Sequence, residues 1–417
     1  MACSGDPDPP AADEGTLEAL HTLGYVDYTD EEASKERSGT VLWDRNKAAP
    51  GYRLYIDPGS CEARLVDLAG LQVHRWKQWF CSTWSYGELL PDGEMLVTSS
   101  SRLRRERWNG WKRWSIRDDV HHAQEPLPDG SILALTERRR QLAPERLEPW
   151  VNNFDEVREH LDDLWLQDHC LTRISADGDE LDSLCLLELL EDNPIGFEIQ
   201  PNNASFDRQT DEYLVDLFHL NSAQWLVDSP LAAQDPMYEA GNVLISVRNQ
   251  DSVMILDWDA RELRWAWGQG QLAGQHDASL LDDGNILLFD NGVDWTQLEN
   301  EITQTMEMDG TEARHAERRR VRPSRVIELD PRSGEQVWEF PGLGQQRLNT
   351  VARGSAQRLP NGNTLIAASS MGYAVEVTRA GEKVWEFYNP SKKEEKRAAI
   401  VLVRHYPAAW VEPFLER

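Results

Sequence analysis

The chain has 417 residues, of which 40% are hydrophobic and 28% charged, and its formal net charge is -29 at pH 7. This charge argues against nucleic acid or an anionic membrane surface as a partner, because phosphate groups would be repelled. Two basic stretches, 102–117 and 314–325, have the opposite sign. They are either solvated surface or a local attraction for an anionic substrate. No stretch is long and apolar enough to predict a transmembrane segment.

Residues 1–38 are predicted to form a tail or tether, followed by one folded domain over 39–417. The first residues read MACSG and have no apolar region before them, so no secretion signal is present as written. An Ala-Cys-Ser start before a stretch rich in Asp, Pro, Ala and Glu resembles a bacterial lipoprotein without its signal, with Cys3 as the lipid anchor. An ordinary unstructured N-terminus is the alternative. The lipoprotein interpretation predicts a periplasmic or cell-envelope location. Residues 18–28 are expected to form a short helix.

The five cysteines are too few and too scattered for a disulfide scaffold. If Cys3 carries a lipid, Cys61 with Cys81 and Cys170 with Cys185 are candidates to pair, and the sequence leaves this pairing open. Neither pair has the spacing of a zinc site.

One hairpin pattern occurs four times. In each copy a Leu precedes Pro/Asp-Asp/Asn-Gly and an apolar run, and the residue five positions before that Leu is small or a histidine. Asp-Gly or Asn-Gly between alternating apolar residues indicates a tight hairpin, because Gly and Asn tolerate positive φ. The turn glycines of the four copies are Gly93, Gly130, Gly284 and Gly362.

A second hairpin repeat, which starts with 52–76, ends in a strand that carries a tryptophan. A degenerate copy at 171–178 lacks this tryptophan. One hairpin of each kind makes a four-stranded unit, and units that recur about every 40 residues are typical of propeller blades. Five clear units and a degenerate one predict an all-β fold, a six-bladed β-propeller, with seven blades as the alternative. The complete copies end at Trp76, Trp265, Trp338 and Trp385.

Two segments interrupt the β pattern. Apolar residues between 147 and 164 are spaced for one face of a helix, so 141–168 is predicted to be a helical insertion over a propeller surface. Residues 294–325 form a polar insertion. Such loops either shape access to a site or are solvent-exposed decoration.

Histidines occur at the hairpin register that should face the central channel. His122 and His276 lie five residues before the Leu of their turns. Asn221 lies five residues before Leu226, and His219 is two residues earlier. Side chains along a strand alternate with period two, so His219 and Asn221 should face the same side. Arg248 lies in a neighbouring strand. One register of successive blades converges at the axis, so these side chains should cluster at one mouth of the channel.

Three histidines with an arginine predict a site for an anion or a metal. Arg248 argues against a metal, since its fixed charge raises the cost of placing a cation beside it. No Gly-rich phosphate loop opens a helix, and we expect neither a metal nor a cofactor. A lone histidine in a propeller is more often a structural hydrogen-bonding group, and most tryptophans here are expected to be packing residues.

A series of short motifs occurs in a fixed order along the chain. Together they resemble the arylsulfotransferase family of bacterial, PAPS-independent aryl-sulfate sulfotransferases, over about 52–389. The resemblance implies a six-bladed propeller with its site at the central channel. It also implies transfer of sulfate from one phenolic ester to another phenol through a sulfohistidine. The motifs are Phe218-His219-Leu220-Asn221-Ser222, Ser246-Val247-Arg248, Gln275-His276-Asp277, Phe289-Asp290-Asn291-Gly292, Ser324-Arg325 and Gln357-Arg358-Leu359-Pro360-Asn361-Gly362-Asn363.

The resemblance assigns roles to individual residues. His276 matches the histidine that becomes sulfated, and Arg248 and His219 match the residues that hold sulfate and assist proton transfer. His122 matches the remaining channel histidine, although the neighbouring His121 leaves this assignment open by one position. Asn221 and His121 are candidates for substrate contact.

These roles agree with the chemistry of the side chains. A neutral imidazole is a competent nucleophile, a guanidinium fork holds two sulfate oxygens, and a second histidine can move the phenolic proton. The implied partners are an aryl sulfate and a phenol. Relatives often have an acidic residue where this chain has Ala123-Gln124, which leaves the orientation of His122 open. Two other interpretations remain, a non-catalytic propeller that binds an anionic ligand or a partner protein, and a histidine-ligated metal enzyme.

Overall fold

The computed structural model describes most of the chain beyond the N-terminal tail. Cys3 and residues 18–27 of the helix expected over 18–28 lie outside the described residues, whereas Tyr28 begins strand β1 (Tyr28–Glu32). β1 belongs to a small sheet with β28 (Lys392–Lys393) and β29 (Lys396–Ala398). The described residues are 28–32, 37–79, 81, 83–99, 101–117, 119–207, 210–294, 321–341, 348–393 and 396–415.

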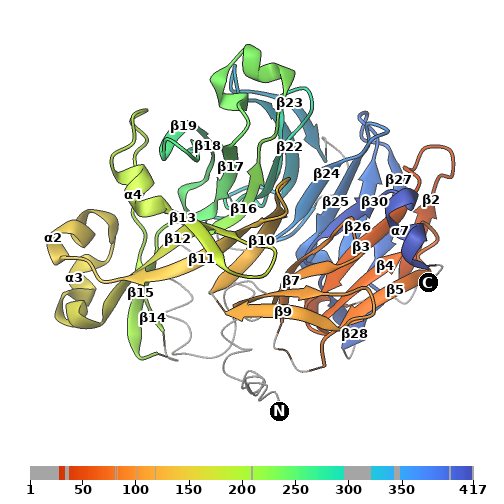
Figure 1. Ribbon diagram of the computed structural model, residues 1–417, viewed down its shortest axis with the longest axis horizontal. Coiled ribbons are helices and arrows are strands. Elements are labelled where there is room, and N and C mark those ends of the chain that lie inside the picture. The colour runs from red at the N-terminus through yellow and green to blue at the C-terminus, as the bar shows by residue number, and fades with distance from the viewer. Residues whose placement is uncertain are drawn as a thin grey trace.

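Six antiparallel sheets stand in a ring, which confirms the six-bladed β-propeller (Figure 1). The innermost strands of neighbouring blades contact one another around the central axis. The C-terminal strand β30 is the innermost strand of the first blade, where it pairs with β3, so the two ends of the propeller domain close the ring together. From the innermost strand outward, the first blade is β30 (Val403–Tyr406), β3 (Tyr52–Asp57), β4 (Glu62–Val66) and β5 (Gln72–Lys77). The second blade is β6 (Trp84–Leu89), β7 (Met95–Ser99), β8 (Arg102–Glu106) and β9 (Lys112–Arg117). The third blade is β10 (Val120–Pro126), β11 (Ile132–Arg140), β12 (Leu164–Ile174) and β13 (Glu180–Cys185).

The other three blades follow the same order, and two additions extend the sheets. Strands β15 (Glu212–Asp216) and β14 (Ala204–Asp207) join the third blade through a parallel pairing of β15 with β12. Strand β2 (Gly39–Trp43) adds to the outer edge of the sixth blade. The fourth blade is β16 (Leu220–Trp225), β17 (Asn242–Val247), β18 (Ser252–Asp257) and β19 (Glu262–Trp267). The fifth blade is β20 (His276–Leu280), β21 (Ile286–Asp290), β22 (Arg325–Asp330) and β23 (Glu335–Phe340). The sixth blade is β24 (Ser355–Arg358), β25 (Thr364–Ala368), β26 (Tyr373–Val377) and β27 (Lys383–Tyr388).

The repeated Asp/Asn-Gly motif makes the turn between the two innermost strands of a blade. In each of the four copies the Leu before the turn accepts a hydrogen bond from the turn glycine, as Leu127 does from Gly130 at 3.0 Å. All four turn glycines have positive φ, which Gly adopts without a steric penalty. These turns fix the register of the inner strands, and with it the place of the residues at their other ends.

Tryptophans of the outer strands connect five of the six blades to the next blade. Trp385 of the sixth blade donates its indole N–H to the carbonyl of Leu68 in the first blade at 2.9 Å. The third blade, whose repeat lacks the tryptophan, has no such contact among the described residues. These indoles therefore serve packing and blade-to-blade hydrogen bonding. The other four contacts are Trp76 to Arg107, Trp114 to Ala176, Trp265 to Pro331 and Trp338 to Arg379.

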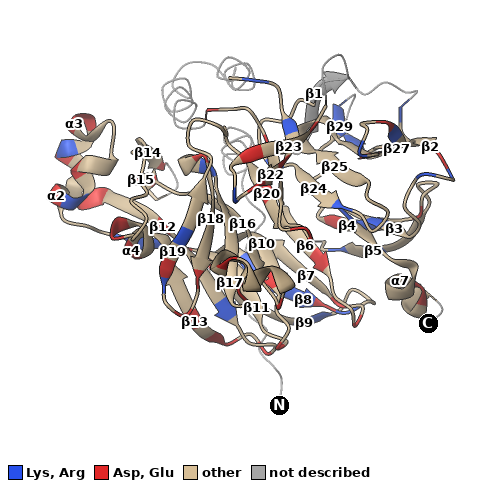
Figure 2. Ribbon diagram, turned by 90° about the horizontal axis from the view of Figure 1, so that it is seen from above, with Lys and Arg blue, Asp and Glu red and all other residues tan. Residues whose placement is uncertain are grey.

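The predicted insertion, 141–168, is helical only within 144–163, because residues 164–168 already belong to strand β12. Its helical part is not the single helix that the apolar spacing suggests. It consists of α2 (Pro144–Leu147), η1 (Glu148–Trp150), α3 (Phe154–Val157) and η2 (Arg158–Asp163). Val151 interrupts the helical path because it forms a β-bridge with Asn202. Figures 1 and 2 place α2 and α3 at one edge of the molecule and α7 (Ala408–Leu415) at the opposite edge.

Short helical segments also interrupt the later blades. In Figure 2 basic and acidic residues are scattered among the other residues along the ribbon. No helix of the described residues is long and apolar enough to cross a membrane. The remaining helical segments are α4 (Leu186–Glu191), η3 (Pro230–Ala233), η4 (Pro236–Tyr238), η5 (Arg248–Gln250) and η6 (Ser369–Met371).

Two kinds of long-range link add to the blade packing. Cys61 is bonded to Cys81 and Cys170 to Cys185, the two pairings that the sequence left open. The first and sixth blades are also joined by a fully buried ion pair, in which Arg53 Nη2 lies 2.7 Å from Glu376 Oε2.

Candidate functional site

The inner strands of three neighbouring blades begin with an irregular backbone. His122, His219 and Asp277 have φ of 49°, 48° and 56°, in the left-handed region that non-glycine residues rarely occupy. The strand pairing shifts register at the same places, between Val120 and Gln124 in the third blade and between Leu220 and Ser222 in the fourth. Such bulges redirect side chains and concentrate at functional sites.

His276 is held from both sides of its ring. Its Nδ1 lies 2.8 Å from Asn291 Oδ1 and 3.0 Å from the carbonyl oxygen of Gly274, so both neighbours accept and the Nδ1 nitrogen carries the proton. Its Nε2 accepts a longer hydrogen bond, 3.2 Å, from the backbone N–H of Arg353. The hydrogen bonds thus fix one tautomer, in which the lone pair is on Nε2.

Next to His276, two histidines and a carboxylate form a chain of hydrogen bonds. Asp216 accepts from His219 Nδ1 at 2.5 Å and from the His219 backbone N–H at 2.9 Å. The Nδ1 nitrogen of His219 therefore donates, and its Nε2 accepts from His122 Nε2 at 3.0 Å. The ring centroids of His122 and His276 are 6.3 Å apart, so this chain of hydrogen bonds ends beside the His276 ring.

Arginines from two blades lie beside these rings. Arg248, at the end of β17, donates its backbone N–H to the carbonyl of His219 at 3.1 Å, and its Nε lies 2.9 Å from Asn249 Oδ1. Arg353 precedes β24. Both side chains are buried, and they are close enough to repel a proton from the nearby imidazoles.

The electrostatic surroundings keep the three rings neutral. Burial, together with Arg248 and Arg353, lowers the pKa of His276 to about 3. Burial also lowers the pKa of His122 and of His219 well below the ordinary value, with the neighbouring histidines and Arg248 adding to the shift. The two guanidinium groups beside neutral imidazoles can attract an anionic ligand, while the Asp216 carboxylate is bound to His219 Nδ1.

A separate hollow lies further along the same inner strands. It has a volume of about 790 Å³, and its lining includes Asp277, Arg404, Glu88 and Glu125 but none of the three clustered histidines. Arg404 is paired with Asp277 at 2.5 Å, and burial with the nearby Glu88 raises the pKa of Glu125 to about 8. The lining thus combines carboxylates with the arginines Arg404 and Arg105.

The structure brings His122, His219, Arg248 and His276 together, as the hairpin register predicted. His122 faces the other rings, whereas His121 donates its Nε2–H to the carbonyl of Leu220 at 2.7 Å. His219 precedes β16 and has a left-handed backbone, so the period-two comparison with Asn221 does not apply to it.

Asn221 is bound to Gln275, the residue that precedes His276. Its Nδ2 donates to the carbonyl of Gln275 at 2.7 Å. Among the described residues, no group forms a hydrogen bond with its buried Oδ1.

Sequence reasoning missed the groups that orient the histidines. Asn291 lies in a motif that was recognised but given no role, and Asp216 lies three residues before His219, where an acidic side chain can reach the ring. Arg353 lies just before Gly354, the residue at the channel register of the sixth blade. Only the pattern of turns could have indicated it.

Comparisons with known proteins add a family. A family model described as "Arylsulfotransferase (ASST)" matches residues 119–390. No curated protein matches the chain. Among solved structures, a protein of unknown function from Bacteroides caccae is similar at 13% identity and a TM-score of 0.49, covering 85% of this chain and 98% of that one. A streptogramin B lyase structure is similar at 9% identity and a TM-score of 0.41, covering 87% of each chain.

Proposed function

Since this chain belongs to the arylsulfotransferase family, we propose that it transfers sulfate from an aryl sulfate donor to a phenolic acceptor through a sulfohistidine at His276. The observation that carries this proposal is the fixed tautomer of His276, with its Nδ1–H bound to Asn291 and its Nε2 lone pair next to the channel histidines. A neutral imidazole of this kind is a nucleophile at neutral pH.

In the first half-reaction, His276 Nε2 attacks the sulfur of the donor. The N–S bond forms, the S–O bond to the aryl group breaks, and the phenolate leaves. The Arg353 backbone N–H that now reaches Nε2 at 3.2 Å marks the direction of attack. In the second half-reaction the oxygen of the acceptor phenol attacks the same sulfur, and the N–S bond breaks.

Arg248 supports both half-reactions by holding the sulfuryl oxygens. Its planar fork can donate two hydrogen bonds to a tetrahedral oxyanion, and its charge is already desolvated in the site. A guanidinium fixed before the reaction stabilises the charge that develops as the sulfuryl group is transferred. Arg353 adds a second positive charge near the ring.

The Asp216–His219–His122 chain supplies and recovers the phenolic proton. The neutral His122–His219 pair takes up one proton from solvent as the anionic donor binds. The donor phenolate then takes this proton as it leaves, and the acceptor phenol returns a proton to the pair. Asp216 holds the His219 ring and stabilises its protonated form. A bound sulfate ester brings a negative charge that also favours that form. Asn221 remains our candidate for contact with the phenol, because its Oδ1 is buried near His276.

We also place the protein in an oxidising compartment, such as the periplasm or cell envelope. The two disulfide bonds support this location, because such bonds persist where thiols are not kept reduced. Lipid attachment at Cys3 belongs to the same proposal. Membrane fractionation of wild type and Cys3→Ala tests it.

The transfer proposal is tested with a panel of chromogenic aryl sulfates, each assayed with and without an added phenol. We expect phenolate release that depends on the acceptor, with a sulfated acceptor as the second product. His276→Asn should abolish release, whereas His160→Asn, an exposed histidine of the insertion, should not change it. Release at the same rate without acceptor, or release by His276→Asn at the wild-type rate, would overturn the proposal.

A further inference from the structure

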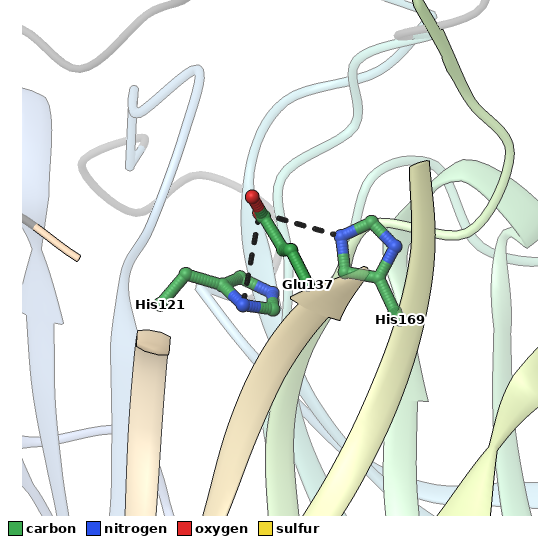
Figure 3. A group of neighbouring side chains, drawn as sticks. All are labelled: His121, Glu137 and His169. Atoms are coloured by element: carbon green, nitrogen blue, oxygen red, sulfur yellow. Dashed lines mark ion pairs between the residues drawn. The ribbon is translucent and has the colours of Figure 1, made fainter. Parts of the chain in front are cut away.

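A second group of histidines lies behind the channel cluster, within the third blade. His121, Glu137 and His169 come from the adjacent strands β10, β11 and β12, and Glu137 pairs directly with His169 in the β11–β12 register. The Glu137 carboxylate lies between the two rings, 3.7 Å from His121 Nδ1 and 3.6 Å from His169 Nε2 (Figure 3). One ligand atom from each of the three side chains lies within 4.8 Å of the other two.

Three of the four ring nitrogens in this group have no hydrogen-bond partner among the described residues. Neither nitrogen of His169 forms a hydrogen bond in the part of the chain that the structure describes, although the residue is fully buried. His121 Nδ1, which faces Glu137, is also without one. Buried polar atoms are nearly always satisfied in native proteins, and an unsatisfied one calls for an unseen ion or water. The chemistry of the three side chains indicates whether an ion or a water molecule suits this place.

The outer side of each ring is already oriented in the manner of a metal ligand. His121 gives its Nε2–H to the carbonyl of Leu220, which leaves the Nδ1 lone pair toward Glu137. His169 Nδ1 lies 3.8 Å from Asp216 Oδ1, so a carboxylate stands behind the ring whose Nε2 faces Glu137. Metal-bound histidines typically have a carbonyl or a carboxylate at the second nitrogen.

We propose that His121 Nδ1, His169 Nε2 and the Glu137 carboxylate bind a first-row divalent cation of the zinc class. Two imidazoles with one carboxylate are a ligand set that suits zinc and its neighbours, whereas calcium and magnesium prefer oxygen ligands alone. The fixed charge of Arg248 is no objection, because the charged groups nearest to His169 are the carboxylates of Glu137, Asp216 and Asp168. Glu137 is 30% exposed, which gives an ion a way in.

The proposal goes beyond sulfate transfer and does not depend on it. Asp216 touches both clusters, since one carboxylate oxygen lies near His169 and the other accepts from His219. A cation at His169 would therefore hold the carboxylate that orients the channel pair, and its role would be one of positioning. No step of the transfer passes through it.

The test is metal binding by the full chain after treatment with a chelator. Zinc is titrated by calorimetry and counted by elemental analysis, and cobalt is used as a spectroscopic probe because bound Co²⁺ absorbs in the visible. Glu137→Gln and His169→Gln each remove one ligand, and His160→Gln, an exposed histidine of the same blade, is the matched control. If His169→Gln fails to fold, Glu137→Gln alone decides, because its side chain is partly exposed and keeps its size.

We expect about one zinc ion per chain in the wild type and in His160→Gln, with an affinity at least about tenfold lower in each ligand variant. Zinc should raise the melting temperature of wild type but not of Glu137→Gln. Absence of stoichiometric binding in the wild type, or equal binding in Glu137→Gln, would overturn the site. Either result leaves the transfer assay untouched, so the two proposals fail separately.

Discussion

Asn291 Oδ1 accepts a hydrogen bond from His276 Nδ1 at 2.8 Å, and this contact decides which nitrogen of His276 is free to react. The same side chain donates through Nδ2 to the carbonyl of Arg353 at 2.9 Å, whose N–H in turn reaches His276 Nε2. Asn291 thus links the position of the ring to the position of the arginine that faces it.

Asn291→Ala should therefore slow transfer with little change in KM. Without Asn291 only the Gly274 carbonyl is left to accept from Nδ1, so the ring takes the other tautomer more readily, in which Nε2 carries the proton and is not nucleophilic. We expect kcat to fall at least about tenfold, as is seen when the group that orients a catalytic histidine is lost. Asn389→Ala, at another buried asparagine with a backbone partner, controls for stability. An unchanged kcat in Asn291→Ala would contradict the tautomer argument.

Arg248→Lys should weaken transfer strongly while the fold is kept. A lysine ammonium is a point charge and does not replace the planar fork that holds two sulfuryl oxygens. Loss of one preorganised donor to a developing charge costs about 10²–10³ in kcat. Arg264→Lys, on the exposed face of β19, should transfer at the wild-type rate. A small effect at Arg248, equal to that at Arg264, would remove the guanidinium from the mechanism.

The low pKa of His276 makes stability depend on pH in a defined direction. The folded value is about 3 and the ordinary value is 6.5, so between these values the unfolded chain binds a proton that the folded chain does not. Stability attributable to His276 is therefore complete above 6.5 and falls as the pH drops toward 3, by up to about 1.4 kcal/mol per pH unit.

Urea unfolding of wild type and His276→Asn from pH 7.5 to 4.5 measures this contribution. The variant should have the smaller slope of unfolding free energy against pH. Parallel curves would show that His276 is not buried in the neutral form.

The Arg53–Glu376 pair should be a strong contributor to ring closure. Glu376→Gln leaves the Arg53 guanidinium buried without a counter-charge, and we expect a loss of about 3–5 kcal/mol in unfolding free energy. Glu382→Gln breaks the exposed pair with Lys47 in the same blade and should cost less than about 1 kcal/mol. Chemical denaturation of both variants gives the comparison, and similar small losses would show that the buried pair does not hold the ring.

The blades could be predicted from the sequence because their signals are local. Each Asp/Asn-Gly turn and each outer tryptophan repeats at a fixed offset, so the six sheets and the common end of the histidines follow from spacing. The helical insertion was harder, since the bridge from Val151 to Asn202 breaks a pattern that reads as one helix.

The groups that set the chemistry of the site could not be predicted in the same way. Asn291, which directly follows the second strand of the same blade, and Arg353, from the next blade, both contact His276. Glu137 and His169 meet His121 only through strand register and a bulge. Such contacts depend on three-dimensional neighbours, and even the short motif that contains Asn291 does not indicate which side chain it contacts.

The central claim is that sulfate is carried covalently on His276, and intact-protein mass spectrometry tests it most directly. Brief incubation of the wild type with an active aryl sulfate should add the mass of one sulfuryl group, and a phenolic acceptor should then remove it. His276→Asn, shown to be folded, should gain no mass under the same conditions. Full labelling of His276→Asn, or acceptor-dependent turnover in a wild type that is never labelled, would contradict the account.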